Sequence, residues 1–150
     1  MTTSIRKATP SDEDAILNLI RELFEPPGGF PAAFTDERAR EGIRYALDNP
    51  NSDILLAVED DTVIGMASVY KDYFSIRDGW RTWLQDLVVT SDYRSGGVGS
   101  ALLSAAAGWA RDHGCTHVDL ASGLGRKDAH RFYQRERMHK ASYDFRLQLD

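Results

Sequence analysis

The segment "YRSGGVGSALL", residues 93–103, constrains this chain most, because it places three glycines within four positions. The strand-type run "WRTWLQDLVV" comes before it, and "SALLSAAAGWA" follows with apolar residues at helical spacing. A strand that leads through such a loop into a helix requires a helix packed on a sheet. The sequence therefore predicts a strand over 80–89, a glycine-rich loop and a helix over about 97–113.

The loop has the character of an anion site. The first N–H groups of a helix have no partner within the helix, and the helix dipole favours negative charge there. Gly96, Gly97 and Gly99 lack a Cβ atom, so the backbone can approach a phosphate closely, and Arg94 adds a permanent positive charge. The alternative is a tight turn without a ligand. The spacing fits neither a dinucleotide fingerprint nor a Walker loop.

Strands and helices are mixed along the rest of the chain. Strands are expected at 5–8, 53–59, 62–70 and 117–122 and within 141–149, and helices over about 10–24, 35–47 and 127–135. Thr9 as N-cap and Pro10 at the first helical position mark the start of the first helix, and Asp60 and Asp61 mark a hairpin. The fold class is therefore α/β or α+β, with a partly antiparallel sheet.

Length and composition favour a single domain over residues 1–150, with a core built from the 42% of residues that are hydrophobic. The net charge of −5 excludes the basic surface that nucleic-acid binding needs. The single cysteine, Cys115, suits a reducing compartment, and no stretch has the length of a membrane span. We expect a cytoplasmic protein that binds small ligands or proteins, but neither nucleic acid nor a membrane.

Two motifs together resemble a known family. Residues 94–99, "RSGGVG", look like the Arg/Gln-x-x-Gly-x-Gly/Ala acyl-coenzyme-A signature of the GNAT N-acetyltransferases, in the strand–loop–helix context of that family. Downstream, "RKDAHRFYQRE", residues 126–136, resembles the family's Ala-x-x-Phe-Tyr helix. The resemblance covers essentially the whole chain. It implies a GNAT fold, with a central mixed, largely antiparallel sheet flanked by helices.

Within the family, "LQDLVV" and "RKDAHRFYQRE" are most similar to the aminoalkylphosphonate N-acetyltransferases. This similarity makes an aminoalkylphosphonate a candidate acceptor. Substrate contacts tend to lie on loops that vary between relatives, so other amines stay open.

The resemblance implies acetyl-CoA as co-substrate. The backbone of Leu87, Val88 and Val89 is expected to pair with the pantetheine arm as an added strand would. The pyrophosphate is expected to bind the loop formed by Arg94, Ser95, Gly96, Gly97, Val98, Gly99 and Ser100. By the same analogy Asp128 and His130 lie near the coenzyme. The alternative for His130 is a position that faces solvent, and this is the expectation for Arg131.

Two side chains are candidates for the chemistry of acetyl transfer. Tyr133 matches the family's usual acid, and a phenol pKa of about 10 suits protonation of a departing thiolate. The alternative for Tyr133 is packing beside Phe132. Asp86 is the candidate base or amine-orienting carboxylate, and alternation places it on the opposite face from Leu87. A carboxylate is a poor direct base for an ammonium, so relay through water or electrostatic capture is the expected role, and the alternative is a solvated strand-edge acid.

Two further segments are ambiguous. Tyr73, Phe74, Trp80 and Trp83 lie in an aromatic stretch that is expected either to line the acceptor pocket or to form a plain amphipathic hairpin. "HGCTH", residues 113–117, lacks the spacing of a zinc site, and its Gly114 suits the C-terminal cap of the preceding helix, so no metal ligands are assigned.

The chain departs from the family pattern at two positions. Arg137 stands where a glycine usually follows the Phe-Tyr pair, and a positive φ angle there would cost about 1 kcal/mol. Ser122 stands where many relatives have asparagine, which weakens any assignment of a side-chain amide contact to the coenzyme.

The sequence thus predicts an enzyme that transfers acetyl from acetyl-CoA directly to a primary amine of a small molecule, with no covalent enzyme intermediate, because the sole cysteine has no evident paired base. Two alternatives stay open, namely a non-catalytic acyl-CoA-binding sensor and a protein or peptide lysine acetyltransferase. GNAT proteins are often dimers, so a homodimer is a candidate assembly.

Overall fold

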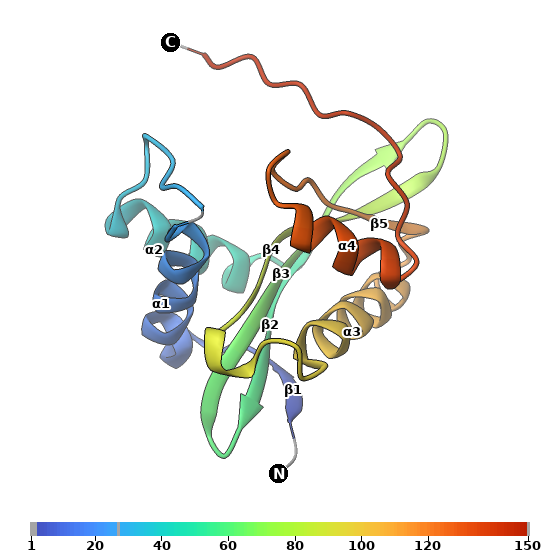
Figure 1. Cartoon of the computed structure of the whole chain (residues 1–150). Coiled ribbons are helices and arrows are strands. Elements are labelled where there is room, and N and C mark those ends of the chain that lie inside the picture. Colours follow the sequence, from blue (N-terminus) through green and yellow to red (C-terminus); the bar gives the residue numbers. More distant parts are fainter. Residues whose placement is uncertain (1–2, 27, 150) are drawn as a thin grey trace. The chain divides into compact units, whose positions relative to one another are not determined.

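The computed structural model describes residues 3–26 and 28–149, and the chain divides into two compact units, Met1–Asp119 and Leu120–Asp150. The first unit holds the sheet and most of the helices (Figure 1). Its elements, in chain order, are β1 (Ser4–Lys7), α1 (Glu13–Phe24), α2 (Asp36–Asp48), β2 (Ser52–Glu59), β3 (Thr62–Ser75), β4 (Gly79–Val89), α3 (Val98–Asp112) and β5 (His117–Asp119). The second unit contains α4 (Lys127–Arg135).

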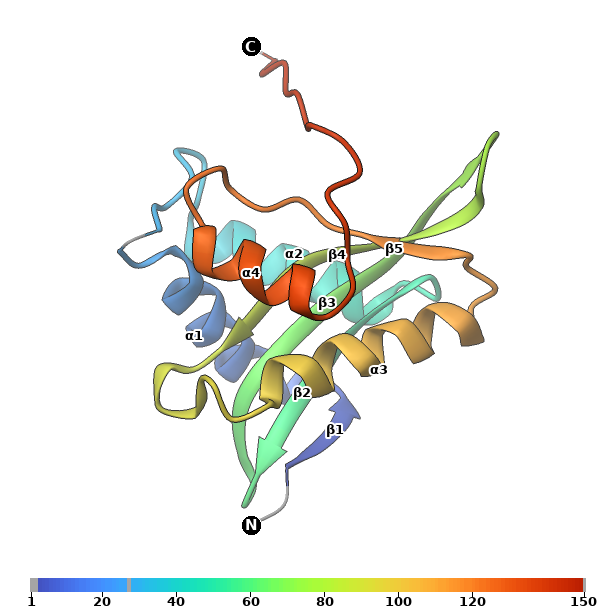
Figure 2. The same cartoon turned by 45° about the vertical axis from the view of Figure 1, so that its right-hand side comes forward.

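The sheet has the order β1-β2-β3-β4-β5, and every pair is antiparallel except β4 with β5, which is parallel. Helices α1 and α2 cover one face of this sheet and α3 covers the other (Figure 2). The expected class, a mixed and largely antiparallel sheet flanked by helices, is confirmed. The expectation of a single domain stays a prediction, because the two units are described separately.

A buried carboxylate fixes the start of the first helix. Pro10–Asp12 form a 3-10 turn that leads into α1, and the Thr9 N–H donates to the Asp12 carboxylate at 2.8 Å. The Arg6 guanidinium donates two hydrogen bonds to the same carboxylate, each of 2.9 Å. These bonds, with the hydrogen bond from Arg6 the largest cause, lower the pKa of Asp12 to about 2.

The core lies on both faces of the sheet. Between the sheet and helices α1 and α2, the fully buried side chains of Ile16, Leu56 and Met66 form one apolar cluster with their neighbours. On the opposite face α3 buries Leu102 and Ala106 completely. Gly65 of β3 permits the close approach of α3, because a Cβ atom there would lie 3.1 Å from the Cδ1 atom of Leu102.

Helix α3 ends in a Schellman motif, as the position of Gly114 predicts. The Cys115 N–H donates to the Ala110 carbonyl and the Gly114 N–H donates to the Arg111 carbonyl. Gly114 has a φ of +76°, which glycine adopts without strain.

Helix α4 of the second unit ends in the same motif without a glycine. The Met138 N–H donates to the Tyr133 carbonyl, and the Arg137 N–H donates to the Gln134 carbonyl. Arg137 therefore occupies the left-handed position, with a φ of +70°. The strain predicted for an arginine at this position is present.

Two predicted strands differ from the structure. The strand expected over 117–122 ends at Asp119, and the strand expected within 141–149 is wrong, because these residues form no strand pairing. The alternating side chains of Tyr143, Phe145, Leu147 and Leu149 are all largely exposed. Alternation creates an apolar face, but a strand also needs a neighbour for its backbone hydrogen bonds. The other predicted elements are confirmed to within a few residues, apart from β3, which runs on to Ser75.

Replacing Arg137 with glycine should stabilise the protein. We expect Arg137→Gly to raise the free energy of unfolding by about 0.5–1 kcal/mol, because glycine relieves the left-handed strain but loses more chain entropy on folding. Arg137→Ala, which removes the side chain and keeps the strain, should leave stability within about 0.5 kcal/mol of the original. Urea denaturation measures both, and equal effects of the two substitutions would contradict the strain account.

Candidate active site

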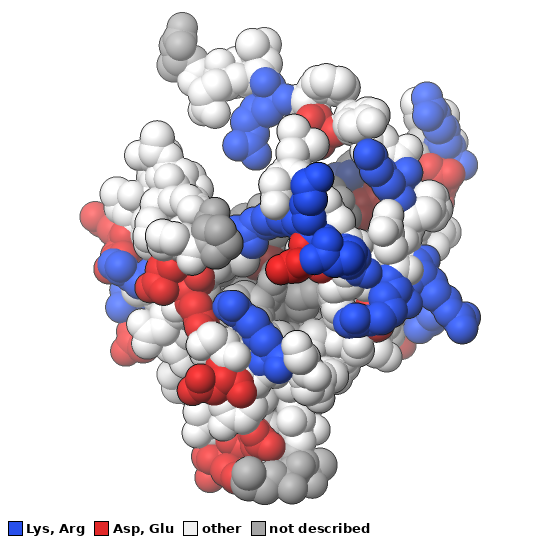
Figure 3. Space-filling model, in the orientation of Figure 1, with Lys and Arg blue, Asp and Glu red and all other residues white. Residues whose placement is uncertain are grey.

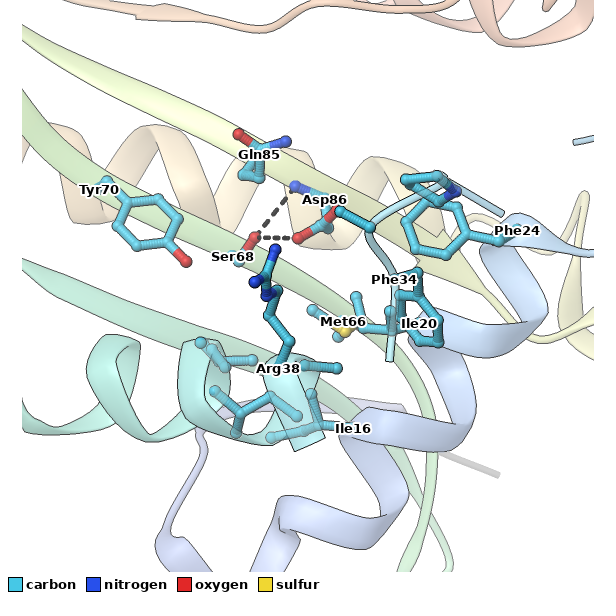
Figure 4. Close-up of a pocket in the computed structure, with 16 residues that line it drawn as sticks. Ile16, Ile20, Phe24, Phe34, Arg38, Met66, Ser68, Tyr70, Gln85 and Asp86 are labelled. Carbon is cyan, nitrogen blue, oxygen red and sulfur yellow. Dashed lines mark hydrogen bonds between the residues drawn. The ribbon is translucent and has the colours of Figure 1, made fainter. Parts of the chain in front are cut away.

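A pocket of about 320 Å³ opens between helices α1 and α2 and strands β3 and β4 (Figure 4). Its wall is mostly apolar, and Arg38, Ser68, Tyr70, Gln85 and Asp86 supply the polar groups. The apolar side chains that line it come mainly from α1, α2 and the loop between them: Ile16, Ile20, Phe24, Pro31, Ala33, Phe34, Ala39, Ile43, Ile54 and Met66. Such an apolar cavity with a few convergent polar groups is typical of a small-molecule site.

An irregularity in the sheet positions Asp86. Ser68 pairs with Asp86 and Val69 pairs with Leu84, so Gln85 is an extra residue on β4. The bulge places Gln85 and Asp86 at the pocket, while Leu84 is fully buried elsewhere in the core. Asp86 pairs across the sheet with Ser68 and Leu87 pairs with Ala67, so Asp86 and Leu87 have the opposite orientations that alternation predicts.

Asp86 and Ser68 bind each other twice. The Ser68 hydroxyl donates to the Asp86 carboxylate at 3.0 Å, and the Asp86 N–H donates to the Ser68 Oγ atom at 3.0 Å. Burial raises the pKa of Asp86, and the hydrogen bond from Ser68 only partly opposes this. A carboxylate with a raised pKa is better matched to an amine proton than an ordinary aspartate, and it attracts a cation strongly because water solvates it poorly.

Tyr70 adds a neutral hydroxyl to the same wall. Burial is the largest cause that raises the pKa of Tyr70 to about 12, and the negative charge of Asp86 adds to it. The phenol therefore stays protonated at neutral pH. It can donate a hydrogen bond to an anionic or carbonyl oxygen in the pocket.

Beside Asp86, strand β4 has an open edge. Parallel pairing with β5 is limited to Arg81, Thr82 and Trp83. Beyond Trp83, no strand among the described residues pairs with β4 on the side away from β3. Leu87 and Val88 thus lie on an edge that can accept an extended ligand as an added strand. The Val89 carbonyl is partly occupied, because the Arg94 Nε atom donates to it at 2.9 Å.

The glycine loop presents free backbone N–H groups at the start of α3. Across the described chain, the N–H groups of residues 96–100 have no hydrogen-bond acceptor. Gly97 is the N-cap residue with a φ of +89°, and Ser95 has a φ of +66°. Gly96 and Gly99 do not adopt positive φ angles, so the expected role of glycine backbone angles holds only for Gly97. The free N–H groups and the charge of Arg94 fit a phosphate ligand.

The second unit carries the remaining candidates. Tyr133 is half-buried on α4 with its ring 5.4 Å from that of Phe132, and burial raises its pKa while the Arg126 guanidinium lowers it. Asp128 forms an ion pair with Arg131, which is exposed as expected, and a ring nitrogen of His130 lies 2.9 Å from the Gly123 carbonyl. Asp128 and His130 therefore have partners within their own unit, and their coenzyme role stays a prediction.

The aromatic stretch before Asp86 does not line this pocket. Tyr73 and Phe74 are exposed near the end of the β3–β4 hairpin, where the ring of Phe74 packs against that of Trp80 at 5.4 Å. Trp83 contributes indirectly, because its indole N–H donates to the Gln85 side chain at 2.6 Å. Their arrangement is that of a hairpin, and a role in acceptor binding stays a prediction.

Sequence reasoning missed Arg38, Ser68 and Tyr70 as pocket residues. They come from two elements that are far apart in sequence from the glycine loop. The only available signal was weak, namely a serine and a tyrosine within the otherwise apolar run "MASVY".

Among the described residues, every helix is too short or too polar to span a membrane. Nor do three or more His, Cys, Asp or Glu side chains come together there in a way that could hold a metal ion.

Comparison with known proteins decides the family. Residues 14–137, which are most of the chain, match the acetyltransferase (GNAT) family. The chain belongs to the GNAT family. It is 33% identical over 141 residues to the aminoalkylphosphonate N-acetyltransferase of Salmonella typhimurium strain LT2, covering 94% of this chain and 88% of that protein. It is also 45% identical over 80 residues to the uncharacterized N-acetyltransferase YhdJ of Bacillus subtilis, covering 53% of this chain and 56% of that one.

Solved structures agree on the fold. The aminoglycoside N-acetyltransferase AAC(6')-Iy in complex with CoA superimposes with a TM-score of 0.84 at 17% identity, covering 99% of this chain and 95% of that chain. The resemblance carried by the glycine loop and the Phe-Tyr helix is thus confirmed. The family match also confirms the predicted N-acetyltransferase class and acetyl-CoA as co-substrate.

Gly97 should contribute to the stability of the protein through its backbone angle. A Cβ atom at Gly97 would meet nothing within 4 Å, and the same holds at Gly108 inside α3. We expect Gly97→Ala to lower the free energy of unfolding by about 1 kcal/mol and Gly108→Ala to raise it by about 0.5–1 kcal/mol. Urea denaturation of both variants tests this, and a stabilising Gly97→Ala would contradict it.

The charge of the partly buried Asp86 should reduce stability. Because folding raises the pKa of Asp86, the folded state binds this proton more tightly, so the ionised group lowers the free energy of unfolding at pH 7. We expect Asp86→Asn to raise Tm at pH 7, with a gain that disappears as the pH falls below about 4, the ordinary range of aspartate. The exposed Asp92→Asn is the matched control and should change Tm little. An Asp86→Asn variant that is less stable at both pH values would refute this account.

Proposed function

We propose that the protein acetylates the primary amine of a small molecule, by direct attack of that amine on the thioester of acetyl-CoA. The observation that carries the proposal is the partly buried Asp86 carboxylate, whose pKa burial raises, in the wall of a pocket that adjoins the open edge of β4. A pocket of about 320 Å³ is at the small end of ligand sites, which favours a small acceptor over a folded protein.

The acceptor enters as an ammonium and must lose a proton before it can attack. Asp86 attracts the ammonium and orients it, and its raised pKa makes it a better proton acceptor, directly or through one water, than an exposed aspartate. The Ser68 hydroxyl holds the carboxylate in place through its 3.0 Å bond. The new N–C bond then forms as the C–S bond breaks.

The donor is proposed to bind along the residues named by the family resemblance. The edge at Leu87 and Val88 suits the pantetheine arm, and the free N–H groups of residues 96–100 with Arg94 suit the pyrophosphate. Asp128 and His130 are proposed to lie near the coenzyme.

Tyr133 is the proposed acid that protonates the departing thiolate. Support comes from its place in the "AHRFY" helix and from its half-buried phenol. Burial raises its pKa, which keeps it protonated and ready to donate at neutral pH.

An aminoalkylphosphonate is the finer candidate for the acceptor. The 33% identity to the Salmonella typhimurium aminoalkylphosphonate N-acetyltransferase, over most of both chains, supports it. The bulge-bearing segment "LQDLVV" and the α4 sequence resemble that subfamily.

The first test is release of free thiol from acetyl-CoA with a panel of aminoalkylphosphonates, aminoglycosides, polyamines, amino acids and a lysine peptide. We expect turnover with a small primary amine. We expect Tyr133→Phe to lower kcat about 100-fold or more with little change in KM, the size of effect that general acid catalysis contributes. Tyr143→Phe, at an exposed tyrosine of the same unit, should leave kcat unchanged.

Other outcomes point elsewhere. Tight binding of acetyl-CoA without turnover of any amine would favour the sensor alternative. Turnover of the lysine peptide alone would favour a peptide acetyltransferase. An unchanged kcat in Tyr133→Phe would remove the acid role from that residue.

A further inference from the structure

The acceptor pocket contains a second charged side chain of opposite sign. Arg38, in the first turn of α2, lines the pocket together with Asp86 of β4. Figure 4 shows its side chain rising from α2 into the pocket, toward the side on which Ser68 and Asp86 lie. Its backbone is fixed there, because its N–H donates to the Thr35 Oγ atom at 3.0 Å.

Arg38 differs from the other arginines of α1 and α2. Arg40 lies 2.7 Å from Glu13 and 2.8 Å from Asp14, Arg44 lies 2.8 Å from Glu13, and Arg21 forms an ion pair with Asp36. Acidic side chains are abundant on this part of the surface (Figure 3). Even so, within the described chain the Arg38 guanidinium has no ion pair or hydrogen bond.

Arg38 and Asp86 also do not neutralise each other. No ion pair joins them, and Arg38 is not among the groups that shift the pKa of Asp86. The pocket therefore holds a cation and an anion that no ion pair joins, and Ile20, Phe34 and Met66 are among its apolar lining. Arg38 is exposed to solvent and Asp86 is partly buried. A ligand that carries both charges, joined by a short apolar chain, could form charge-assisted hydrogen bonds with both groups at once.

We propose that Arg38 is a specificity-determining residue that binds an anionic group at the end of the acceptor remote from its amine. The acceptor class that follows is a short zwitterion, with an ammonium directed to Asp86, a phosphonate, phosphate or carboxylate directed to Arg38, and methylene groups against the apolar wall. The planar guanidinium can donate two parallel hydrogen bonds to such an oxyanion. The neutral Tyr70 hydroxyl lines the same pocket and can donate a third.

The inference rests on the proposed function, since it concerns the acceptor of that reaction. Its test compares matched amines, 2-aminoethylphosphonate and β-alanine against the uncharged ethanolamine, with the original protein and three variants. We expect the original protein to prefer the anionic amines. We expect Arg38→Gln to lower kcat/KM for those amines about 10- to 100-fold, mainly through KM, as loss of a charge-assisted hydrogen bond to a bound substrate does.

Two further variants test whether the effect depends on the position and the geometry of the positive charge. Arg38→Lys keeps the positive charge but loses the bidentate geometry, so its loss should be smaller than that of Arg38→Gln. Arg40→Gln removes an equal charge from the same helix, where it is paired with Glu13 and Asp14 instead of lining the pocket, and should leave the preference unchanged. For ethanolamine, kcat/KM should differ little among all four proteins.

The outcomes distinguish this inference from the proposed function. If amines are acetylated but Arg38→Gln affects charged and uncharged amines equally, the role of Arg38 is wrong while the function stands. If no amine is acetylated, the function is wrong. Binding of 2-aminoethylphosphonate, followed by NMR titration with CoA present, then tests Arg38 directly: weaker binding to Arg38→Gln than to Arg40→Gln supports the anion site, and equal binding overturns it.

Discussion

The pairing of β4 with its neighbours determines where this protein has a pocket next to an open strand edge. Among the described residues, β4 is paired on both sides from Arg81 to Trp83 and afterwards to β3 alone. The extra residue Gln85 lies immediately after this change. The bulge brings Asp86 to the pocket, while the unpaired backbone that follows forms the open edge. A small irregularity in one strand thus places the pocket beside an unpaired strand edge.

Much of the fold follows from local sequence signals. The Asp60–Asp61 step forms the expected turn, with positive φ angles at both residues, and α4 has the bounds that its sequence predicts. These elements are specified by residues that are close together in the chain, as are the caps of α1 and α3. The family could also be predicted from the sequence, because the glycine loop and the Phe-Tyr helix are local motifs.

The pocket could not be predicted in the same way. Arg38, Ser68 and Asp86 come from α2, β3 and β4, and only the packing of these elements brings them together. The bulge at Gln85 leaves no clear mark in "WRTWLQDLVV", since it depends on the register with β3. The prediction of a strand within 141–149 was wrong for a related reason. Alternation describes the side chains of a strand but not the neighbouring strand that its backbone requires. A cytoplasmic location and a homodimer stay predictions.

The two Schellman motifs suggest a difference in local dynamics. Both close a helix with the same pair of hydrogen bonds, but α3 uses Gly114 where α4 uses Arg137. A strain of about 1 kcal/mol, confined to one turn, makes the opening of that turn roughly fivefold more frequent than in an unstrained cap. The carbonyl held by the strained cap belongs to Tyr133. Tyr133, the proposed acid, therefore lies near a helix end whose amide hydrogens should exchange with solvent more readily than those at the C-terminal end of α3.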